Sequence, residues 1–250
     1  MSRIGQVGIV AVVPTLRDDP SETIESILEQ TIRVSNIFCV VGSQALHRSI
    51  SSLNSTIIEI IFVKPDLNKC LGKRVAKALN TALRKVDLDK YDYILRVDAD
   101  TKLPNNFIEE NLKKNADCVG TSGYAMLINK KAFLEVFHGR FPEVCGEDSY
   151  FCLKLLSRGY IVKPWTLPPI SKRESRVGHP WSHHFNRGEE MYKLGYEPFH
   201  VFNVLRTTLK NPGVLFIVMG YGIAILKQMN RYKFARWVFR RQLKRLVFGK

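Results

Sequence analysis

Several features that define common protein classes are missing from this sequence of 250 residues. No apolar run has the length of a membrane span. Residues 213–226 are almost wholly apolar, but at ~1.5 Å per residue they would cross only about two thirds of a ~30 Å hydrocarbon core. Inclusion of residues 204–209 would lengthen this run, so a single span stays open as the less favoured interpretation. The first apolar run, residues 7–13, ends at Pro14 and has the length of a strand, so no signal peptide is expected.

Closely spaced cysteine pairs are also missing, which argues against zinc knuckles and Cys-x-x-Cys redox motifs. The five cysteines are Cys39, Cys70, Cys118, Cys145 and Cys152. An odd, scattered set in predicted strands and helices is typical of reduced, mostly buried thiols. We prefer this interpretation to a disulfide framework.

Acidic residues are missing from the end of the chain. Residues 227–250 contain many Lys and Arg and no Asp or Glu, whereas the acidic residues concentrate before Glu197. The formal net charge of +15 therefore reflects a basic tail on a nearly balanced core. A basic surface attracts nucleic acid, anionic lipid or phosphorylated substrates, and charge alone does not choose among them.

The remaining composition, 45% hydrophobic and 24% charged, is that of an ordinary globular protein. Buried strands alternate with helices along the first half, which predicts an α/β fold with a largely parallel sheet. Strands are expected over residues 7–13, 37–41, 57–63, 93–97 and 119–128. Helices are expected over 23–30 (with Ser21 as its N-cap), 72–85, 107–112, 130–136 and 149–157, and strand and loop over 163–176.

Ligands of such sheets bind outside the carboxyl ends of the strands. This rule brings Pro14-Thr15, Gly42 and Asp98-Ala99-Asp100 to one rim. Two carboxylates one residue apart suit Mg²⁺ or Mn²⁺, which bind through one or two carboxylates plus substrate phosphates. Such a cation would neutralise the charge that builds on a leaving diphosphate. A bare Asp-x-Asp more often caps the next segment, but the preceding strand favours the metal site here.

Gly72-Lys73-Arg74 opens a predicted helix whose N-terminus should point at the same rim. Backbone N–H groups and the positive end of the helix dipole favour phosphate there, and the two basic side chains would add charge-assisted hydrogen bonds. A solvated basic first turn is the alternative interpretation of these residues.

Glu147-Asp148 is a second carboxylate pair, which can supply a general base that deprotonates an acceptor hydroxyl. Taken alone, the pair is better explained as helix capping. His179, His183 and His184 form a cluster that could complete a metal shell or contact a diphosphate. Surface loop residues are an equally good explanation of each histidine. No helical i, i+4 histidine pair with a glutamate is present, which argues against a zinc protease.

In this order, the pieces resemble the inverting family 2 glycosyltransferases with the GT-A fold, over roughly residues 7–196. The resemblance implies a GT-A domain over residues 1–200, with a mixed, mostly parallel central sheet flanked by helices. The apolar and basic pattern of the later residues predicts a helical extension over 201–250 that contacts membrane. The resemblance also implies metal-assisted transfer of a sugar, of hexosyl type, from a nucleotide-diphosphate donor to an acceptor hydroxyl. A lipid phosphate becomes a possible acceptor if the extension contacts membrane. The motifs that carry the resemblance are Pro14-Thr15, Gly72-Lys73-Arg74, Asp98-Ala99-Asp100, Gly146-Glu147-Asp148 and Arg187-Gly188-Glu189.

The resemblance also implies roles for single residues. Pro14 and Thr15 would line the nucleotide pocket, Asp98 would lie near the ribose and diphosphate, and Arg187 would hold the diphosphate. Asp98 and Asp100 would bind the metal, Asp148 would be the catalytic base, and Glu147 would support the acceptor site. Arg17, Gly72 and Lys73 are added as donor-binding candidates, and His183 is added as a metal candidate.

Two positions depart from the pattern of the family. An acidic residue usually follows the second strand and reads the base, whereas this chain has Val41-Gly42-Ser43-Gln44 there. Arg17-Asp18-Asp19 also stands where Asn-Glu is more usual. Asp66, Asp18 or Asp19 could take over the contact with the base, so the identity of the donor stays open.

Two other function classes compete with this hypothesis. A nucleotidyltransferase would show a glycine-rich basic loop directly after the first strand, and Leu16-Arg17-Asp18-Asp19-Pro20 has no glycine. A non-catalytic protein could use the basic tail to bind nucleic acid or membrane. Bulky apolar residues recur among the Arg and Lys of the tail, as in interfacial helices, and this favours peripheral contact with an anionic membrane over nucleic acid. We therefore expect a lipid-linked or saccharide acceptor at the cytoplasmic face, although residues 213–226 could instead be a core helix.

Overall fold

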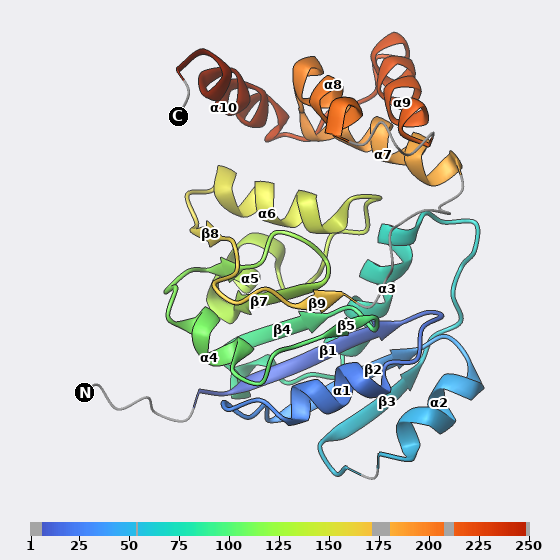
Figure 1. The fold of residues 1–250 in the computed structure, drawn as a ribbon, viewed down its shortest axis with the longest axis vertical. Coiled ribbons are helices and arrows are strands. Elements are labelled where there is room, and N and C mark those ends of the chain that lie inside the picture. The colour runs from blue at the N-terminus through green and yellow to red at the C-terminus, as the bar shows by residue number, and fades with distance from the viewer. Residues whose placement is uncertain (1–6, 54, 172–180, 208–212, 249–250) are drawn as a thin grey trace. The chain divides into compact units, whose positions relative to one another are not determined.

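The computed structural model describes residues 7–53, 55–171, 181–207 and 213–248 (Figure 1). The chain divides into two compact units, which are described separately below. The first unit comprises Met1–Lys69, Lys73–Glu143 and Glu147–Glu174, and the second comprises Cys70–Gly72, Val144–Gly146 and Ser175–Lys250.

Within the described residues, the first unit is built on a seven-stranded sheet in the order β3-β2-β1-β4-β7-β6-β8. Strand β1 pairs in parallel with β2 and β4, β2 with β3, and β6 with β8, whereas β7 runs antiparallel to β4 and β6. The predicted α/β fold with a mixed, mostly parallel sheet is confirmed. The strands are β1 (Ile9–Thr15), β2 (Asn36–Val41), β3 (Ile58–Phe62), β4 (Tyr93–Val97), β6 (Cys118–Val119), β7 (Ala125–Asn129) and β8 (Val162–Lys163), and β5 (Thr101–Lys102) pairs with β9 (Ile170–Ser171) apart from them.

Helices cover both faces of the sheet, which explains why β1 is buried along its whole length. Its side chains alternate between two cores, with Val10 and Val12 on one face and Ala11 and Val13 on the other. Helices α3 (Leu71–Leu83), α5 (Lys130–Phe137) and α6 (Glu147–Ser157) build the first core. Helices α1 (Ser21–Leu28), α2 (Gln44–Ser51) and α4 (Phe107–Leu112) build the second, and a short 3-10 helix spans Leu88–Lys90.

Three local predictions of secondary structure or capping differ from the structure. The single strand expected over residues 119–128 is wrong, because the chain turns after Val119 and forms two antiparallel strands, β6 and β7. Helix α2 was not expected, because its inward face consists of only Leu46 and Ile50, too few for a periodic signal. The Ser43 side chain caps it by accepting a hydrogen bond from the Leu46 N–H at 3.4 Å. The prediction of Ser21 as an N-cap is wrong. Ser21 is already helical, and its backbone N–H donates at 3.0 Å to the Asp19 carboxylate. The Asp19 side chain therefore supplies a hydrogen-bond acceptor at the start of α1.

The second unit is helical, with α7 (Trp181–Leu194), α8 (Pro198–Thr207), α9 (Val214–Leu226) and α10 (Ala235–Phe248). Two glycines let α7 and α9 pack closely. A Cβ added to Gly188 would lie 1.9 Å from the Ile217 carbonyl oxygen, and one added to Gly220 would lie 2.1 Å from that of Phe185. The predicted domain division at residue 200 stays a prediction, and the structure groups α7 with the later helices. Across the described ranges, no helix combines the length and the apolar character that a membrane crossing requires.

The cysteines only partly follow the expectation of reduced, buried thiols. Cys39, Cys118 and Cys152 are free and buried, but Cys70 and Cys145 form a disulfide with a Cα–Cα distance of 5.7 Å. These two are 75 residues apart in sequence, so their spacing gave no sign of the bond. Tertiary structure brings them together, because Cys70 precedes α3, Cys145 precedes α6, and Asn80 of α3 binds the backbone of the same connecting segment at Phe141.

We predict that replacement of both Cys70 and Cys145 by Ser lowers the free energy of unfolding by about 2–4 kcal/mol, because a long loop is no longer closed in the unfolded chain. Urea denaturation with and without a reducing agent measures the effect. Reduction should destabilise the wild type and leave the double variant unchanged. A wild type that is indifferent to reduction would contradict the prediction.

Candidate functional site

The topology of the sheet marks one rim as the place for a ligand. The chain moves outward from β1 through β2 to β3, and then returns to place β4 on the other side of β1. Ligands of open α/β sheets bind at such a switch, outside the carboxyl ends of the strands. Strand β1 ends at Thr15 and β4 ends at Val97, so the Asp98-Ala99-Asp100 segment leaves the sheet beside Thr15. The Gly42 N–H donates to the Thr15 carbonyl oxygen at 3.1 Å, which joins the end of β2 to the same rim.

Asp98-Ala99-Asp100 forms a tight turn that several segments hold in place. The Thr101 N–H closes it by donating to the Asp98 carbonyl oxygen at 3.1 Å, and the Asp98 N–H donates to Tyr124 at 3.0 Å. The Thr23 hydroxyl of α1 donates to the Ala99 carbonyl oxygen at 2.7 Å. The Asp98 side chain is 29% exposed, whereas the whole of Asp100 is 6% exposed. The turn therefore keeps one carboxylate partly open to solvent and the other largely enclosed.

A buried arginine connects this turn to the second carboxylate pair. Arg96 lies on β4, two residues before Asp98, and is 1% exposed. Its Nη2 lies 2.7 Å from Glu147 Oε1 and 3.5 Å from Asp98 Oδ1. A guanidinium buried this deeply needs charged or hydrogen-bonding partners, and the two carboxylates supply them. Arg96 thus ties the end of β4 to the start of α6.

Asp148 joins the same cluster through the backbone. Its Oδ2 accepts from the Gly123 N–H at 3.1 Å, and its Oδ1 accepts from the Ser149 N–H at 2.6 Å. Gly123 cannot carry a side chain without disturbance, because an added Cβ would lie 2.7 Å from Arg96 Nη2 and 3.1 Å from Asp98 Oδ2. The structure therefore brings Asp98, Glu147 and Asp148 together around one guanidinium and one glycine.

The charges of this cluster shift two pKa values. Burial raises the pKa of Glu147 to about 7, and the positive charge of Arg96 opposes this rise. Burial alone would lower the pKa of Arg96, but the charges of Asp98 and Glu147 outweigh burial and raise it. Arg96 therefore stays protonated, while Glu147 can exchange its proton near neutral pH.

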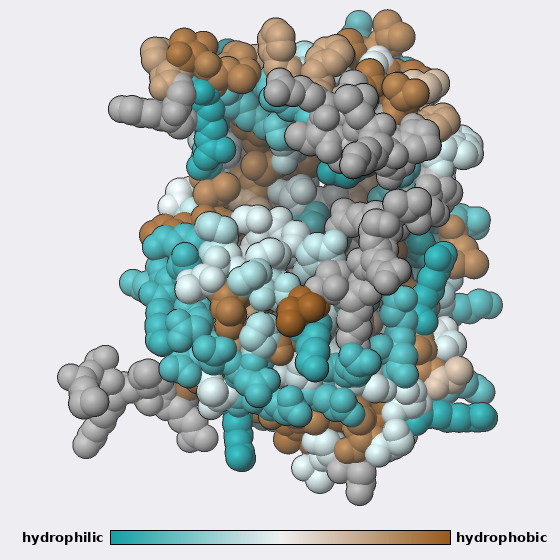
Figure 2. Space-filling view, viewed as in Figure 1, coloured by the Kyte–Doolittle hydropathy of each residue, from teal (hydrophilic) through white to brown (hydrophobic). Residues whose placement is uncertain are grey.

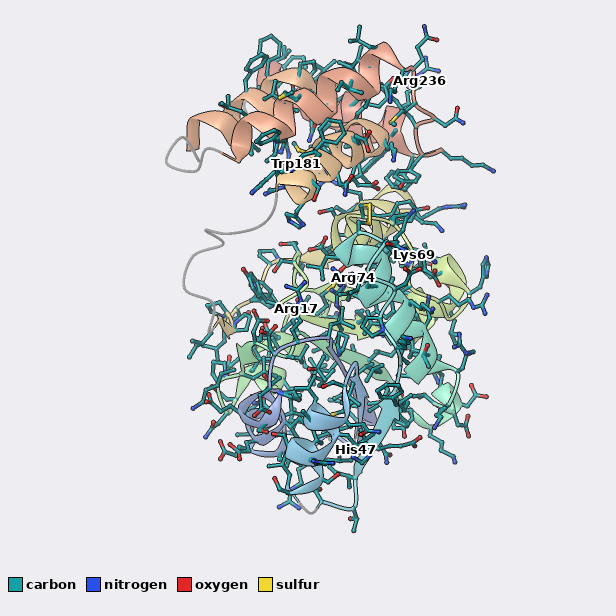
Figure 3. The ribbon with its side chains drawn as sticks, turned by 90° about the vertical axis from the view of Figure 1, so that its right-hand side faces the viewer. Arg17, His47, Lys69, Arg74, Trp181 and Arg236 are labelled. Carbon is teal, nitrogen blue, oxygen red and sulfur yellow. A yellow bond between two sulfur atoms is a disulfide. The ribbon has the colours of Figure 1, made fainter. Side chains whose placement is uncertain are left out.

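A basic pair lies at the ends of β1 and α3. The charge of Arg17, in the loop after β1, acts on Arg74 in the first turn of α3, and Figure 3 shows the two near each other. Burial and the charge of Arg17 lower the pKa of Arg74, and Asp66 partly offsets them. Two cations held this close favour an anion between them. Gly72 is buried and Lys73 is exposed at the same end of α3.

The remaining candidates belong to the second unit. His183 and His184 lie in the first turn of α7, so they are helical and not part of a surface loop, and Arg187 is exposed one turn later. Burial and the charge of Arg187 lower the pKa of His184. His179 lies outside the described residues. The roles of His183 and Arg187 at the metal and diphosphate stay predictions.

The rim offers carboxylates for a cation but no closed metal cage. Among the described residues, no three His, Cys, Asp or Glu side chains gather closely enough to hold a metal by themselves. Asp98 and Asp100 would therefore provide two oxygen ligands, with donor phosphates and water completing the shell. That division of ligands is usual for Mg²⁺, so the residues fit a cation that binds together with a diphosphate.

Sequence reasoning missed Arg96 and Gly123. Arg96 left a signal, because it is the one charged residue within the apolar strand Tyr93–Val97, and Arg is almost never fully buried unless it is paired. Gly123 lies between short segments, and nothing in its local sequence marks it as the contact point of three side chains. Its importance follows only from the distances above.

Comparisons with known proteins bear on the fold. No family model and no curated protein matches the chain. The chain is similar to the mannosyltransferase PcManGT from Pyrobaculum calidifontis, solved in complex with GDP-Man and Mn²⁺, with a TM-score of 0.56, 16% identity and coverage of 95% of this chain and 80% of that chain. It is also similar to a 4-diphosphocytidyl-2C-methyl-D-erythritol synthase from Anaerococcus prevotii, with a TM-score of 0.50, 12% identity and coverage of 72% and 95%. The chain therefore has a GT-A-like nucleotide-diphospho-sugar fold, which glycosyltransferases share with nucleotidyltransferases.

Glu147 should make the stability depend on pH. Its folded pKa of about 7 lies above the ordinary value of 4.5, so the folded state binds this proton more tightly than the unfolded state does. The free energy of unfolding should therefore fall as the pH rises from about 4.5 to about 7. Glu147→Gln removes this contribution. The free energy of unfolding of the variant relative to the wild type should therefore rise by roughly 2–3 kcal/mol between about pH 4.5 and about pH 7.

Urea denaturation at both ends of the window measures the shift. Glu25→Gln, at an exposed position on α1, is the matched control and should keep the pH dependence of the wild type. Parallel pH profiles for the wild type and Glu147→Gln would show that the burial of Glu147 does not raise its pKa.

Proposed function

We propose that the protein is an inverting glycosyltransferase that moves a hexosyl group from a nucleotide-diphosphate donor to an acceptor hydroxyl or lipid phosphate, assisted by Mg²⁺ or Mn²⁺. The observation that carries the proposal is the cluster at the rim. Arg96 joins the carboxylate turn after β4 to the carboxylate pair that opens α6, at 3.5 Å from Asp98 and 2.7 Å from Glu147. This contact supports the proposal, because it brings the candidate metal ligands and the candidate base to the switch point of the sheet.

In this proposal the donor lies across the rim. The basic pair of Arg17 and Arg74 attracts the diphosphate of the donor. The residues proposed to bind the donor are Pro14, Thr15, Arg17, Gly72, Lys73, Asp98 and Arg187. Asp98 and Asp100 would hold the cation, with His183 as a further candidate ligand. Such a cation would supply positive charge to the leaving diphosphate.

The acceptor side of the proposal assigns different tasks to the two residues of the second pair. Asp148 is half-buried, and its two oxygens are oriented by the Gly123 and Ser149 N–H groups, so it can take a proton from an acceptor hydroxyl. Glu147 is buried against Arg96, which leaves it less accessible to an acceptor. Glu147 therefore supports the site, and Asp148 acts as the base. A phosphate acceptor is already ionised and needs no such base.

Asp100→Ala should lower metal-dependent turnover of the donor by at least about 100-fold, because the cation loses one of its two carboxylate ligands. A panel of nucleotide sugars, tested for binding by calorimetry and for hydrolysis with and without Mn²⁺ or Mg²⁺, identifies the donor and measures the loss. Asp89→Ala, at an exposed position, is the matched control, and circular dichroism checks the fold of both variants. Full activity of Asp100→Ala would remove Asp100 from the metal site.

Asp148→Asn should keep donor binding and lower transfer to a hydroxyl acceptor by roughly 100- to 10,000-fold, the usual contribution of a general base. Transfer to a lipid phosphate should change far less. Single-turnover transfer to both kinds of acceptor measures the difference. An unchanged rate with a hydroxyl acceptor would exclude Asp148 as the base, whatever its effect on the lipid phosphate.

The second candidate is a nucleotidyltransferase, which the similarity to the 4-diphosphocytidyl-2C-methyl-D-erythritol synthase favours. The loop Leu16-Arg17-Asp18-Asp19-Pro20 has no glycine to wrap a triphosphate, and this supports the glycosyltransferase instead. The products distinguish the two activities. A glycosyltransferase releases a nucleoside diphosphate from a nucleotide sugar. A nucleotidyltransferase joins the nucleoside monophosphate part of a nucleoside triphosphate to a phosphorylated alcohol and releases pyrophosphate from the triphosphate.

The proposal extends to where the enzyme acts. A saccharide or lipid-linked acceptor, reached by peripheral contact with an anionic membrane at its cytoplasmic face, is supported by the basic and apolar residues after Glu197. Nucleic acid is not expected as a partner, because the same residues include many bulky apolar side chains among the cations.

A further inference from the structure

Apolar side chains face solvent on the helices of the second unit. Phe199 and Phe202 of α8 are 65% and 59% exposed, and Leu226 of α9 and Phe248 of α10 are 83% and 70% exposed. Figure 2 shows hydrophobic surface over α9 and α10. Apolar patches of this kind mark interaction sites on soluble proteins.

Helix α9 shows the feature most clearly, because it is apolar on all sides. Its inward face, which includes Ile217 and Ala224, packs in the core of the second unit. Leu215, Met219 and Leu226 recur at helical spacing on the opposite side and are 64%, 52% and 83% exposed. A helix that is hydrophobic all round is normally buried all round. The outer face of α9 therefore requires a cover that the inner face does not provide.

The inner face of α9 packs closely against α7. Gly188 and Gly220 bring the backbones of α7 and α9 into contact, and the Tyr221 hydroxyl donates to the Tyr196 carbonyl oxygen at 2.7 Å. A rotation of α9 that buried Leu226 would break this fit. The exposure of Leu215, Met219 and Leu226 is thus built into the packing of the unit.

Helix α10 combines cations with exposed apolar residues. Ala235 and Val238 are buried, and Gln242 accepts from the Glu197 N–H at 2.9 Å, so this side faces the rest of the unit. Arg236, Arg240 and Lys244 are exposed and fall on the opposite side by their spacing, together with Val247. Helices α9 and α10 both pack on α7, so their outer faces are the sides turned away from α7.

Charge decides which partner suits these faces. No acidic residue follows Glu197, whereas eleven Lys and Arg do. A specific protein interface carries about one hydrogen bond per 100–200 Å², and the outer face of α9 has no polar side chain to make one. At its headgroup–acyl boundary, an anionic bilayer offers hydrocarbon to the apolar residues, and just above it phosphate to the cations.

We propose that the outer faces of α9 and α10 form a docking surface for an anionic phospholipid bilayer, which the protein binds peripherally. The surface is defined by Leu215, Met219 and Leu226 of α9 and by Arg236, Arg240 and Lys244 of α10. The inference names the partner surface of the proposed enzyme and rests on the proposed function for its purpose. Its structural argument uses the second unit alone.

The test uses the full chain and vesicles of phosphatidylcholine alone or with phosphatidylglycerol. The wild type should float with the anionic vesicles, bind neutral ones at least about tenfold more weakly, and be released as salt rises. Arg236→Gln, Arg240→Gln and Lys244→Gln together should remove the preference for anionic vesicles. Leu215→Ser, Met219→Ser and Leu226→Ser together should weaken binding to both kinds of vesicle.

A matched control separates this surface from general positive charge. Lys77→Gln, Lys90→Gln and Lys131→Gln together remove three exposed cations from the first unit and should leave flotation unchanged. Circular dichroism shows whether each variant folds. If the triple serine variant misfolds, Leu226→Ser alone carries the test, because its side chain is the most exposed of the three.

Three results would overturn the proposal. They are no flotation of the wild type, flotation that ignores lipid charge and both surface variants, and concentration-dependent self-association that Leu226→Ser abolishes in the absence of lipid. Flotation does not require catalysis, so its outcome is separate from that of the glycosyltransferase proposal. Donor hydrolysis by the lipid-surface variants should equal that of the wild type.

Discussion

The arrangement of the rim depends on one buried guanidinium. Arg96 stands among three carboxylates, those of Asp98, Glu147 and Asp148, which raise its pKa together. Without the guanidinium of Arg96, Glu147 would be a buried acid with no compensating charge beside two other acids. Breaking a buried ion pair by removal of one partner generally costs about 3–5 kcal/mol. The Arg96–Glu147 ion pair thus joins α6, which carries the proposed base, to β4, which precedes the proposed metal ligands.

Two other features link α3 to the segment that leads into α6. Asn80 of α3 binds both the N–H and the carbonyl oxygen of Phe141, at 2.7 and 3.0 Å, and the Cys70–Cys145 disulfide fastens the end of the same segment to the start of α3. The segment therefore lies along α3 before it enters α6 at Glu147. The disulfide thus joins the residue before α3, the helix that carries Arg74, to the segment before α6, the helix that carries Asp148.

The fold could be predicted from the sequence largely because its signals are local. The β-branched run of β1 predicts a strand, and the apolar face of α3 predicts a helix. The alternation of such strands and helices predicts the sheet. The position of Asp98-Ala99-Asp100 at the end of a strand could be predicted for the same reason, since the apolar run before it indicates a strand. Helix α2 was missed because only Leu46 and Ile50 face inward.

The connections of the site could not be predicted in this way. The contacts of Arg96 with Glu147 and of Asp148 with Gly123 join residues 51 and 25 positions apart, and the disulfide joins residues 75 positions apart. Such pairs leave no periodic pattern in a single sequence. A lone arginine in a buried strand indicates that a partner exists, but the identity of the partner follows only from tertiary structure.

The structure distinguishes between the acids that could recognise the base of the proposed donor. The residue that follows β2 is Gly42, where an added Cβ would lie 3.2 Å from the Leu16 carbonyl oxygen, so a larger residue is disfavoured at this place. Of the acids that could replace the usual contact with the base, Asp19 accepts from the hydroxyls of Ser21 and Ser49 and so joins α1 to α2. Asp66 instead lies in the loop after β3, where its charge acts on Arg74. An acid beside the proposed diphosphate site is better placed to meet the nucleotide than one that links two helices, and Asp66 is therefore a stronger candidate than Asp19 for recognition of the base.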